Sequence, residues 1–429
     1  MATQVINNSH PQTTKLKESK DIQDSEILND VYDKVVKDIL NSNKDPTIDE
    51  VYKRIKVIMD YNITDGKKNR ALVLINTYKI MKLSEGCSLE DLKLAAILGW
   101  CIEILQGFFL VLDDVMDNSI TRRGKPCWYK ATGLIAINDA LLLEGIIYEI
   151  LEKYFSNLSC YHHLVRQFQM ITMKTTQGQC LDMLSTPEGT RPDLETFTES
   201  RYNGIVRYKT AYYSFVLPVR LALYLAGCSD LEKHNQAEAI LLKMGHFFQV
   251  QDDYLDCFGD YATLGKIGTD IEDAKCSWLV VKALENATEA QKDIINQYYG
   301  INNPDAVNKI KDVYKELDLP KHFLRYEEDT YSEITKLIQE NTLLPSEIYN
   351  FYLRKIYKRQ KRWNGSKRFY KAACSTTNER CLEYEKSSQN LSRDLQVLIQ
   401  KHAGTSSLEY NLVNSTHANL TLYLNSTIF

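Results

Sequence analysis

The sequence predicts an all-α protein, and three observations carry that prediction. Glycine (18) and proline (9), which most often interrupt regular structure, are scarce for a chain of 429 residues. Apolar residues recur at helical spacing, as in Ile27, Val31, Val35 and Ile39. No segment alternates apolar and polar residues convincingly enough to indicate a strand. Hydrophobic residues make up 44% of the chain, which is enough for a sizeable core.

The first predicted elements form a helical hairpin. Helical periodicity begins near Ile27, breaks at Asp45-Pro46 and stops at Thr64-Asp65-Gly66, where turn-forming residues follow one another. Ser88 then precedes two acidic residues, which predicts the N-cap of a long apolar helix that runs to about Met116. Residues 121–126 are predicted to form a loop. Further helices are expected over residues 138–156, 160–185, 196–225, 230–258, 276–285, 304–316, 320–341 and 346–362, with a loop at 259–275.

Composition divides the chain into three parts. Residues 1–26 are polar and are predicted to form a disordered arm. Residues 27–362 carry the helical periodicity and are predicted to form one helical domain. The sequence from 363 to 429 is rich in Ser, Thr and Asn, so we expect a poorly ordered extension, whose role the sequence does not indicate.

Bulk properties exclude several classes of partner. The formal charge of −4 is nearly neutral for this length, so neither nucleic acid nor an anionic membrane is implied. No apolar run reaches the roughly 18 residues that cross a bilayer, so no membrane span is expected. The ten cysteines lack paired C-x-x-C spacing, which favours a reducing compartment over disulfides or a zinc site. The N-terminal residues match neither a secretory signal nor a transit peptide, so the expected location is the cytoplasm, with mitochondria and peroxisomes left open.

Two acidic segments of the chain repeat each other. Phe108-Phe-Leu-Val-Leu-Asp-Asp-Val-Met-Asp117 returns as Phe247-Phe-Gln-Val-Gln-Asp-Asp-Tyr-Leu-Asp256, with both phenylalanines, the valine and three aspartates in register. In helices, Asp113 and Asp117 would share a face, as would Asp252 and Asp256, with Asp114 and Asp253 beside them. A single cluster of this kind is often only a solvated helix surface, but six carboxylates in two matched clusters repel unless cations lie between them. Mg²⁺ suits such oxygen ligands and is typically shared with substrate phosphates, so the repeat predicts a phosphorylated ligand.

Cationic residues occur where they would meet the same phosphates. Lys67 and Arg70 lie at a predicted helix start, where free backbone N–H groups also favour anions. The pair Arg122-Arg123 closely follows Asp117 and suits bidentate binding of phosphate. Lys209 interrupts an apolar and aromatic helix, which predicts that it is buried and paired. Other polar residues near the clusters, each of which alone more often satisfies a neighbouring backbone group, are Gln106, Gln179, Asp182, Thr210, Gln249, Lys266 and Lys275.

Several motifs together resemble a known family of enzymes. They are Gly66-Lys-x-Asn-Arg70, Gly99 to Gln106, Phe108 to Trp128, Lys209-Thr-Ala-Tyr-Tyr-Ser-Phe215, Phe247 to Asp260, Gly265-Lys-Ile-Gly-Thr-Asp270, Lys275-Cys-Ser-Trp-Leu279 and Ile356-Tyr-Lys-Arg359. Through them, residues 27–362 resemble the short-chain trans-isoprenyl diphosphate synthases, and most closely the eukaryotic farnesyl diphosphate synthases. The resemblance implies the isoprenoid synthase fold, a helical bundle around a deep central cavity. It also implies a homodimer and three Mg²⁺ ions, with Mn²⁺ as the alternative metal.

The resemblance also assigns expected roles to individual residues. Metal binding falls to Asp113, Asp114, Asp117, Asp252, Asp253 and Asp256. The allylic diphosphate is expected to contact Arg122, Lys209, Thr210, Gln249 and Lys266. Isopentenyl diphosphate is expected to contact Gly66, Lys67, Arg70, Gln106, Arg123 and Arg359, while Gln179 would line the reacting region. Phe108 and Phe109, about 6 Å or one turn before the aspartates, would form the floor that stops chain growth at fifteen carbons.

The sequence departs from the family pattern at three positions and leaves other functions open. Asp65 and Ala71 replace glycines, and Gln360 interrupts a basic run, which puts isopentenyl diphosphate binding and site closure in question. A terpene synthase, which ionises a prenyl diphosphate without condensation, would need the aspartates but not the second anion site. A geranyl diphosphate synthase differs only in its product. A non-catalytic subunit usually lacks one or more of the aspartates, and here all six are present.

Overall fold

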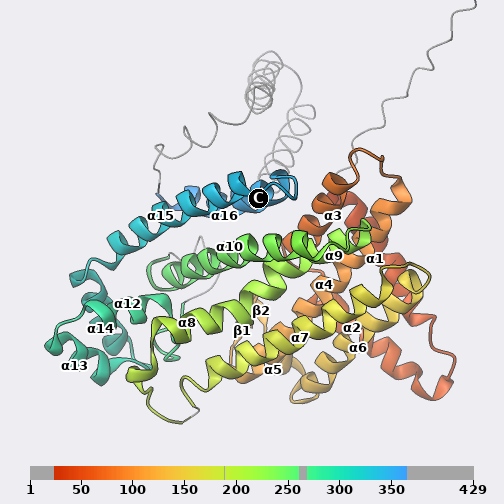
Figure 1. The fold of residues 1–429 in the computed structure, drawn as a ribbon. Coiled ribbons are helices and arrows are strands. Elements are labelled where there is room, and N and C mark those ends of the chain that lie inside the picture. Colours follow the sequence, from red (N-terminus) through yellow and green to blue (C-terminus); the bar gives the residue numbers. More distant parts are fainter. Residues whose placement is uncertain (1–23, 188, 260–267, 365–429) are drawn as a thin grey trace, which may run out of the picture. The chain divides into compact units, whose positions relative to one another are not determined.

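The computed structural model describes residues 24–187, 189–259 and 268–364, and side chains as far as residue 357. Within these ranges the chain is almost entirely helical, which confirms the predicted all-α class (Figure 1). The elements are α1 (Asp24–Leu40), η1 (Pro46–Ile48), α2 (Asp49–Asn62), α3 (Asn69–Met81), α4 (Leu89–Met116), β1 (Thr121–Arg122), β2 (Lys125–Pro126), α5 (Trp128–Thr132), α6 (Ile135–Phe155), α7 (Tyr161–Met183), η2 (Leu194–Thr196), α8 (Glu199–Ile205), η3 (Val206–Val216), α9 (Leu217–Leu225), α10 (Leu231–Phe258), α12 (Trp278–Asn286), α13 (Glu289–Tyr298), α14 (Pro304–Glu316), α15 (Leu319–Glu340) and α16 (Glu347–Asn364). Most of the predicted N-terminal arm (1–26) and C-terminal extension (363–429) lies outside the described residues; residues 24–26 begin α1 rather than belong to an arm, and residues 363–364 end α16.

Helix α4 is the centre of the main core. Its N-terminus is the predicted one: Ser88 and Asp91 form a capping box, in which each side chain binds the backbone of the other residue. The helix packs against α1, α3 and α6. It is long and apolar enough to cross a membrane by length and composition, yet 78% of its most apolar 18-residue window is buried inside the protein. That burial is typical of a core helix.

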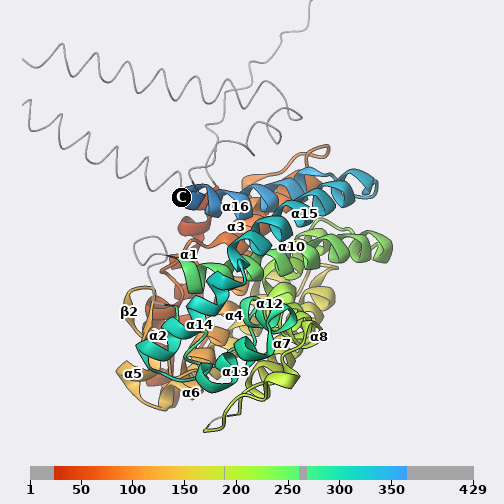
Figure 2. The same ribbon diagram turned by 90° about the vertical axis from the view of Figure 1, so that its left-hand side faces the viewer.

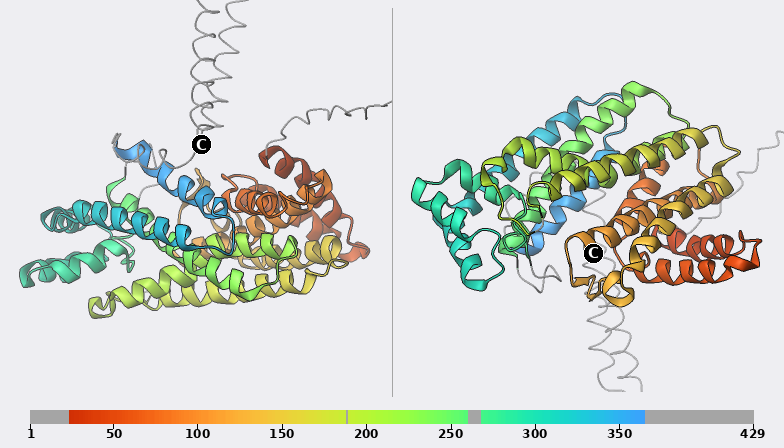
Figure 3. Two further views of the ribbon diagram at one scale, coloured as in Figure 1. Left: turned by 45° about the horizontal axis from the view of Figure 1, so that its top comes forward. Right: turned by 90° about the horizontal axis from the view of Figure 1, so that it is seen from below.

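A second, smaller core lies where α8, α12, α13, α14 and α15 meet the C-terminal part of α10. Figures 1 and 3 show α12, α13 and α14 gathered at one end, away from the N-terminal helices α1 to α3. Helix α15 runs beside α10 in both Figure 1 and Figure 2. Helix α10 therefore belongs to both cores and carries the second aspartate cluster between them.

The structure differs from the sequence prediction at several elements, among them the short helix α5 (Trp128–Thr132), which was not expected. Residues 121–126 form a two-stranded hairpin rather than a plain loop. Helix α13, which begins with a Thr288–Gln291 capping box, was not expected, because its apolar stripe is short. The helix predicted over 196–225 contains an eleven-residue π-helix, η3, in its middle. π-Helical segments are rare in proteins, and those that occur are often found at functional sites.

Two glycines explain where η3 lies. A Cβ atom on Gly178 of α7 would lie 2.1 Å from the backbone N of Lys209, and one on Gly245 of α10 would lie 2.6 Å from the Cβ of Ala211. The backbones of α7 and α10 therefore approach η3 more closely than any larger residue allows. This close packing fixes the position of the segment that carries Lys209.

Candidate active site

The first aspartate cluster lies at the C-terminal end of α4. Asp114 is buried and accepts a hydrogen bond from Arg122 Nε at 2.9 Å. Arg122 Nη2 also lies 3.4 Å from Asp113 Oδ2. Arg122 is brought there by the β1–β2 hairpin, whose turn residues Arg123 and Gly124 both have positive φ (54° and 75°), as tight hairpin turns require. The hairpin thus places a guanidinium directly beside two of the predicted carboxylates.

Two lysines join this cluster to α7 through alternating charges. Lys209 Nζ lies 2.7 Å from Asp182 Oδ2 and 3.3 Å from Asp113 Oδ1. Lys275 Nζ lies 2.8 Å from Asp117 Oδ1 and 3.3 Å from the same Asp182 oxygen. We call these five residues the acid–lysine network. It draws on α4, α7, η3 and the segment before α12.

The acid–lysine network keeps both lysines charged. Burial alone would lower the pKa of Lys209, but Asp182, Asp113 and Asp117 outweigh it and raise that pKa above its ordinary value. The pKa of Lys275 is raised in the same way, against burial, by Asp182 and Asp117. Burial and the neighbouring Asp113 raise the pKa of Asp117, although Lys275 opposes them. An additional cation between the two aspartates would relieve that repulsion.

The second aspartate cluster lies on α10, and its members are held differently. Asp253 is buried, and its two oxygens accept hydrogen bonds from Gln249 Nε2 at 2.9 Å and from the backbone N of Trp278 at 2.8 Å. Burial raises the pKa of Asp253 to about 6. Asp256 Oδ2 accepts from the backbone N of Asp270 at 3.0 Å. Asp252 is half-buried and stands one turn before Asp256, on the predicted common face.

Segment η3 links the two clusters. Thr210 donates a hydrogen bond to Gln249 Oε1 at 3.0 Å, and Gln249 in turn donates to Asp253. Lys209, the neighbour of Thr210, belongs to the network around the first cluster. One short stretch of backbone therefore contacts the surroundings of both clusters.

A largely apolar cavity of about 580 Å³ is lined mainly by α4, α7 and η3. Its lining residues are Phe108, Phe109, Leu110, Leu112, Asp113, Met116, Thr175, Thr176, Gln179, Cys180, Met183, Leu184, Pro187, Lys209, Thr210 and Tyr213. Phe109 packs against Phe108 and Tyr213, with ring centroids 5.0 and 5.5 Å apart. The cavity therefore has charged groups at Asp113 and Lys209 and aromatic rings next to them on α4.

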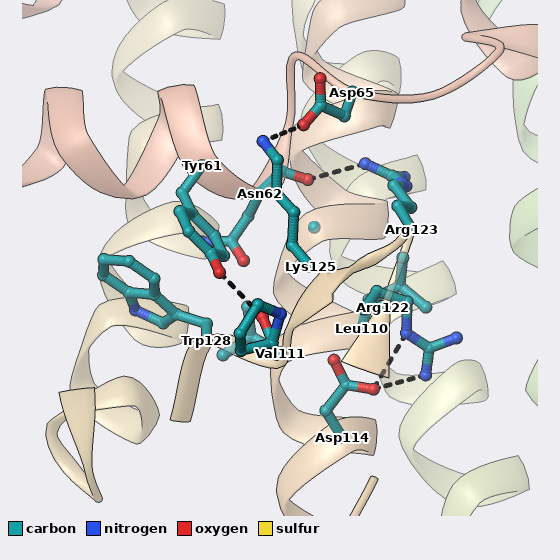
Figure 4. A pocket seen from close by; sticks show the side chains of 12 residues that line it. Tyr61, Asn62, Asp65, Leu110, Val111, Asp114, Arg122, Arg123, Lys125 and Trp128 are labelled. Carbon is teal, nitrogen blue, oxygen red and sulfur yellow. Dashed lines mark hydrogen bonds and ion pairs between the residues drawn. The ribbon is translucent and has the colours of Figure 1, made fainter. Parts of the chain in front are cut away.

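A second set of cations lies beside the loop that precedes α3, and Figure 4 shows two of them, Arg123 and Lys125, next to Asp65. Arg70 donates to Ser214 Oγ at 2.7 Å and to Tyr213 Oη at 3.1 Å, and its guanidinium lies 4.7 Å from the Tyr213 ring. The guanidinium of Arg123 would lie 3.2 Å from a Cβ on Gly66, where φ is +139°. Burial lowers the pKa of Arg123 from its ordinary value. Gly66 thus leaves room for Arg123 beside the loop that precedes α3.

The remaining predicted site residues fall in several places. Gln106 is half-buried on α4, and Lys67 is exposed just before α3. Lys266 and the side chain of Arg359 lie outside what the structure describes. Lys275 and Asp182 stand out in the sequence only as polar residues in a loop or apolar setting near the clusters. Glu103, which was not predicted as a site residue, is buried and accepts from the backbone N of Ala71 at 3.1 Å.

The carboxylates of the site supply only some of the ligands that a hard divalent cation needs, and a substrate would have to supply others. Among residues 24–187, 189–259 and 268–364, no three carboxylate, imidazole or thiol side chains are grouped closely enough to hold a metal. However, Asp113 Oδ1 is buried and makes no hydrogen bond in this part of the chain, although Lys209 Nζ lies 3.3 Å away as an ion-pair partner. Mg²⁺ usually takes one or two carboxylates and completes its shell with water and substrate phosphates. Such an oxygen, beside Asp117, is therefore suited to a metal that arrives with a diphosphate.

Comparison with known proteins decides the family. The sequence model of the polyprenyl synthetase family matches residues 52–317, which include both aspartate clusters. This chain belongs to the polyprenyl synthetase family. It is 47% identical over 335 residues to farnesyl pyrophosphate synthase 2 of Arabidopsis thaliana, covering 77% of this chain and 97% of that protein. It is also 47% identical over 319 residues to the farnesyl pyrophosphate synthase of Homo sapiens, covering 74% of this chain and 76% of that protein.

Solved structures agree with this membership. The crystal structure of T. Brucei farnesyl diphosphate synthase superimposes with a TM-score of 0.71 at 34% identity, covering 79% of this chain and 99% of that one. Another structure of the same enzyme, complexed with risedronate, gives a TM-score of 0.70 at 33% identity, covering 79% and 98%. The expected isoprenoid synthase fold of this polyprenyl synthetase is thereby confirmed. Enzymes of this family are generally metal-dependent.

Proposed function

We propose that the protein is a farnesyl diphosphate synthase, which condenses isopentenyl diphosphate with dimethylallyl diphosphate and then with geranyl diphosphate. One observation carries this proposal: the chain has two groups of cations. The lysines of the acid–lysine network lie beside the apolar cavity, whereas Arg70, at the start of α3, and Arg123, on the hairpin, lie beside the loop that precedes α3. A terpene synthase would need only the first group.

The two groups of cations suggest how the two substrates are divided. The allylic diphosphate would bind at Arg122, Lys209, Thr210, Gln249 and Lys266, with its hydrocarbon tail in the cavity. Isopentenyl diphosphate would bind at Gly66, Lys67, Arg70, Gln106, Arg123 and Arg359. Because Tyr213 and Ser214 hold Arg70 while Lys209 borders the cavity, η3 would orient the two substrates toward each other.

Metal ions are expected to complete the allylic site. Three Mg²⁺ ions would be held by Asp113, Asp114 and Asp117 on α4 and by Asp252 and Asp256 on α10; Mn²⁺ is the alternative. Bound there, the metal supplies positive charge that stabilises the departing diphosphate. Asp253 would complete the second cluster, and its two oxygens accept hydrogen bonds from Gln249 and the backbone N of Trp278.

The protein's own residues then account for the rest of the chemistry. Lys209, Lys275 and Arg122 are held in place before reaction, so they stabilise charge on the leaving diphosphate without reorganising. The C–O bond breaks to give an allylic cation, and the double bond of isopentenyl diphosphate attacks it. The apolar cavity wall excludes water that would otherwise capture the cation. The final proton leaves to the released diphosphate.

Product analysis tests this proposal. Purified protein with Mg²⁺, geranyl diphosphate and isopentenyl diphosphate is expected to yield farnesyl diphosphate and inorganic diphosphate. A matched reaction without isopentenyl diphosphate is the control. A volatile hydrocarbon or alcohol in that control would instead support a terpene synthase, and accumulation of geranyl diphosphate from dimethylallyl diphosphate would support a geranyl diphosphate synthase.

Replacing Phe109 with alanine is expected to lengthen the product. Phe109 lines the cavity one turn before Asp113, and its ring blocks further growth of the chain against Phe108 and Tyr213. Removing the ring should let a twenty-carbon product form as a major species, as judged by chromatography of the dephosphorylated products. Phe247→Ala, which removes a phenylalanine of the second repeat that is buried in the core, should not change product length. An unchanged product distribution in Phe109→Ala would refute the floor assignment.

We also propose a homodimer, with residues 27–362 as the catalytic domain. Apolar side chains at Leu134, Ile137 and Leu141 recur at helical spacing along the start of α6 and are 72%, 42% and 58% exposed. A second copy of the chain would cover this stripe. Light scattering is expected to give about twice the mass of one chain, and a monomer at micromolar concentration would contradict this.

A further inference from the structure

Asp65 lies in the predicted isopentenyl diphosphate site, where an anion is expected to bind (Figure 4). Its carboxylate accepts a hydrogen bond from Lys125 on β2. Asp65, Arg122, Arg123 and Lys125 line a small pocket together with Tyr61, Asn62, Gly107, Leu110, Val111, Asp114, Pro126 and Trp128. We call this the hairpin pocket. It holds two carboxylates, and Asp114 is the one bound by Arg122.

The hairpin pocket is small as the structure stands. Its volume is about 20 Å³, which is room for roughly one water molecule. A diphosphate is several times larger. Its oxygens can therefore reach Arg123 and Lys125 only if side chains at the pocket move, and the ion pair between Asp65 and Lys125 is half-exposed on both sides (44% and 46%). Half-exposed ion pairs are held weakly, so this contact is the one most easily opened.

The negatively charged carboxylate of Asp65 binds Lys125 as a phosphate oxygen of the substrate would. The hydrogen bond from Lys125, with further attraction from Lys125, Arg123 and Lys68, holds the pKa of Asp65 below its usual range. The carboxylate is therefore fully charged at neutral pH. The cations that attract this carboxylate would also attract the substrate, and in both cases a lysine donates a hydrogen bond to a charged oxygen.

We propose that Asp65 is an internal competitor for the homoallylic diphosphate: substrate binds as Lys125 exchanges the Asp65 carboxylate for a phosphate oxygen. This inference rests on the proposed function for the location of isopentenyl diphosphate. It makes Asp65 a residue that sets substrate affinity rather than a catalytic residue. Its presence weakens binding of the second substrate without affecting the bond-breaking step at the first aspartate cluster.

The test compares Asp65→Asn with the wild type. The asparagine keeps the size and a hydrogen-bond acceptor for Lys125 but removes the charge. We expect KM for isopentenyl diphosphate to fall about threefold to tenfold at low ionic strength, since one nearby charge is removed from a partly solvated site. The difference should shrink as salt is added. KM for geranyl diphosphate and kcat should stay within about twofold of the wild type.

Two further variants act as controls. Asp65→Glu keeps the charge and should retain a KM close to that of the wild type. Asp312→Asn removes the same charge from an exposed pair with Lys315 on α14 and should leave every constant unchanged. An unchanged or higher KM in Asp65→Asn would overturn the proposal, because a residue that only positions Lys125 would give that result.

Calorimetric titration separates this inference from the proposed function. Isopentenyl diphosphate is titrated into each variant without an allylic substrate, and Kd should fall in Asp65→Asn by the same factor as KM. If the wild type fails to condense the two substrates, the proposed function is wrong, while the binding ratio still tests Asp65. If the wild type condenses them and the binding ratio is one, the inference alone is wrong.

Discussion

The Asp113→Ala variant is expected to lose roughly 10³-fold in turnover while keeping its thermal stability. Asp113 lines the cavity, and its buried Oδ1 accepts no hydrogen bond within the described residues and is paired only with the charge of Lys209. Removing it takes away a ligand for the metal that meets the diphosphate. The effect should appear in kcat with Mg²⁺ and saturating substrates, because the lost contact stabilises the leaving group.

The stability of this variant separates function from folding. Arg122 and Lys209 both contact Asp113, but each keeps another carboxylate, Asp114 and Asp182. The repulsion between Asp113 and Asp117 disappears as well. The melting temperature should therefore be unchanged or slightly higher, as measured by circular dichroism. A variant that melts much earlier, or one that keeps activity within tenfold of the wild type, would contradict the assignment of Asp113 to the metal site.

The second large effect is expected from Gly178→Ala. A Cβ at this position would lie 2.1 Å from Lys209 N and 2.5 Å from the carbonyl carbon of Tyr208, so α7 and η3 must move apart. We expect the unfolding free energy to fall by about 2 kcal/mol or more, as in other overpacked sites. Turnover should fall by about 10²-fold, because Lys209 would be displaced from Asp113 and Asp182.

Gly145 on α6 provides a matched control for that substitution. It is also a helical glycine, but a Cβ there would have no heavy atom within 4 Å. Gly145→Ala should therefore be neutral or stabilise the protein by up to about 1 kcal/mol through helix propensity. Chemical denaturation and kinetics of both variants test the expectation. If Gly178→Ala and Gly145→Ala had the same stability and turnover, the close approach of α7 to η3 would not be needed for activity.

Much of the fold could be predicted because helical periodicity is a local property. The capping box at Ser88 and the end of α4 at Met116 lie where the sequence placed them. The common face of Asp113 and Asp117 likewise depends only on helix geometry, and both bind lysines that interact with Asp182. These features need no knowledge of the rest of the chain.

The partners of those aspartates could not be predicted, because they come from distant segments. Asp182 and Lys275 meet only when α7 and the segment before α12 are brought together, and neither has a local signal stronger than its polarity. The close packing of η3 against Gly178 and Gly245 is likewise tertiary. The sequence indicated which groups carry the chemistry, and the packing determines how they are joined.

Because η3 carries residues of both anion sites, the number of residues in η3 constrains the active site more than the identity of most of them. Lys209, beside the cavity, and Ser214, which holds Arg70, occur on a single continuous segment. Deleting one residue between them would rotate everything that follows about the helix axis. Point substitutions in 206–216 can alter one anion site at a time, whereas an insertion or deletion there would misalign both at once. Related enzymes should therefore differ in amino-acid sequence across residues 206–216 while the length of this segment stays constant.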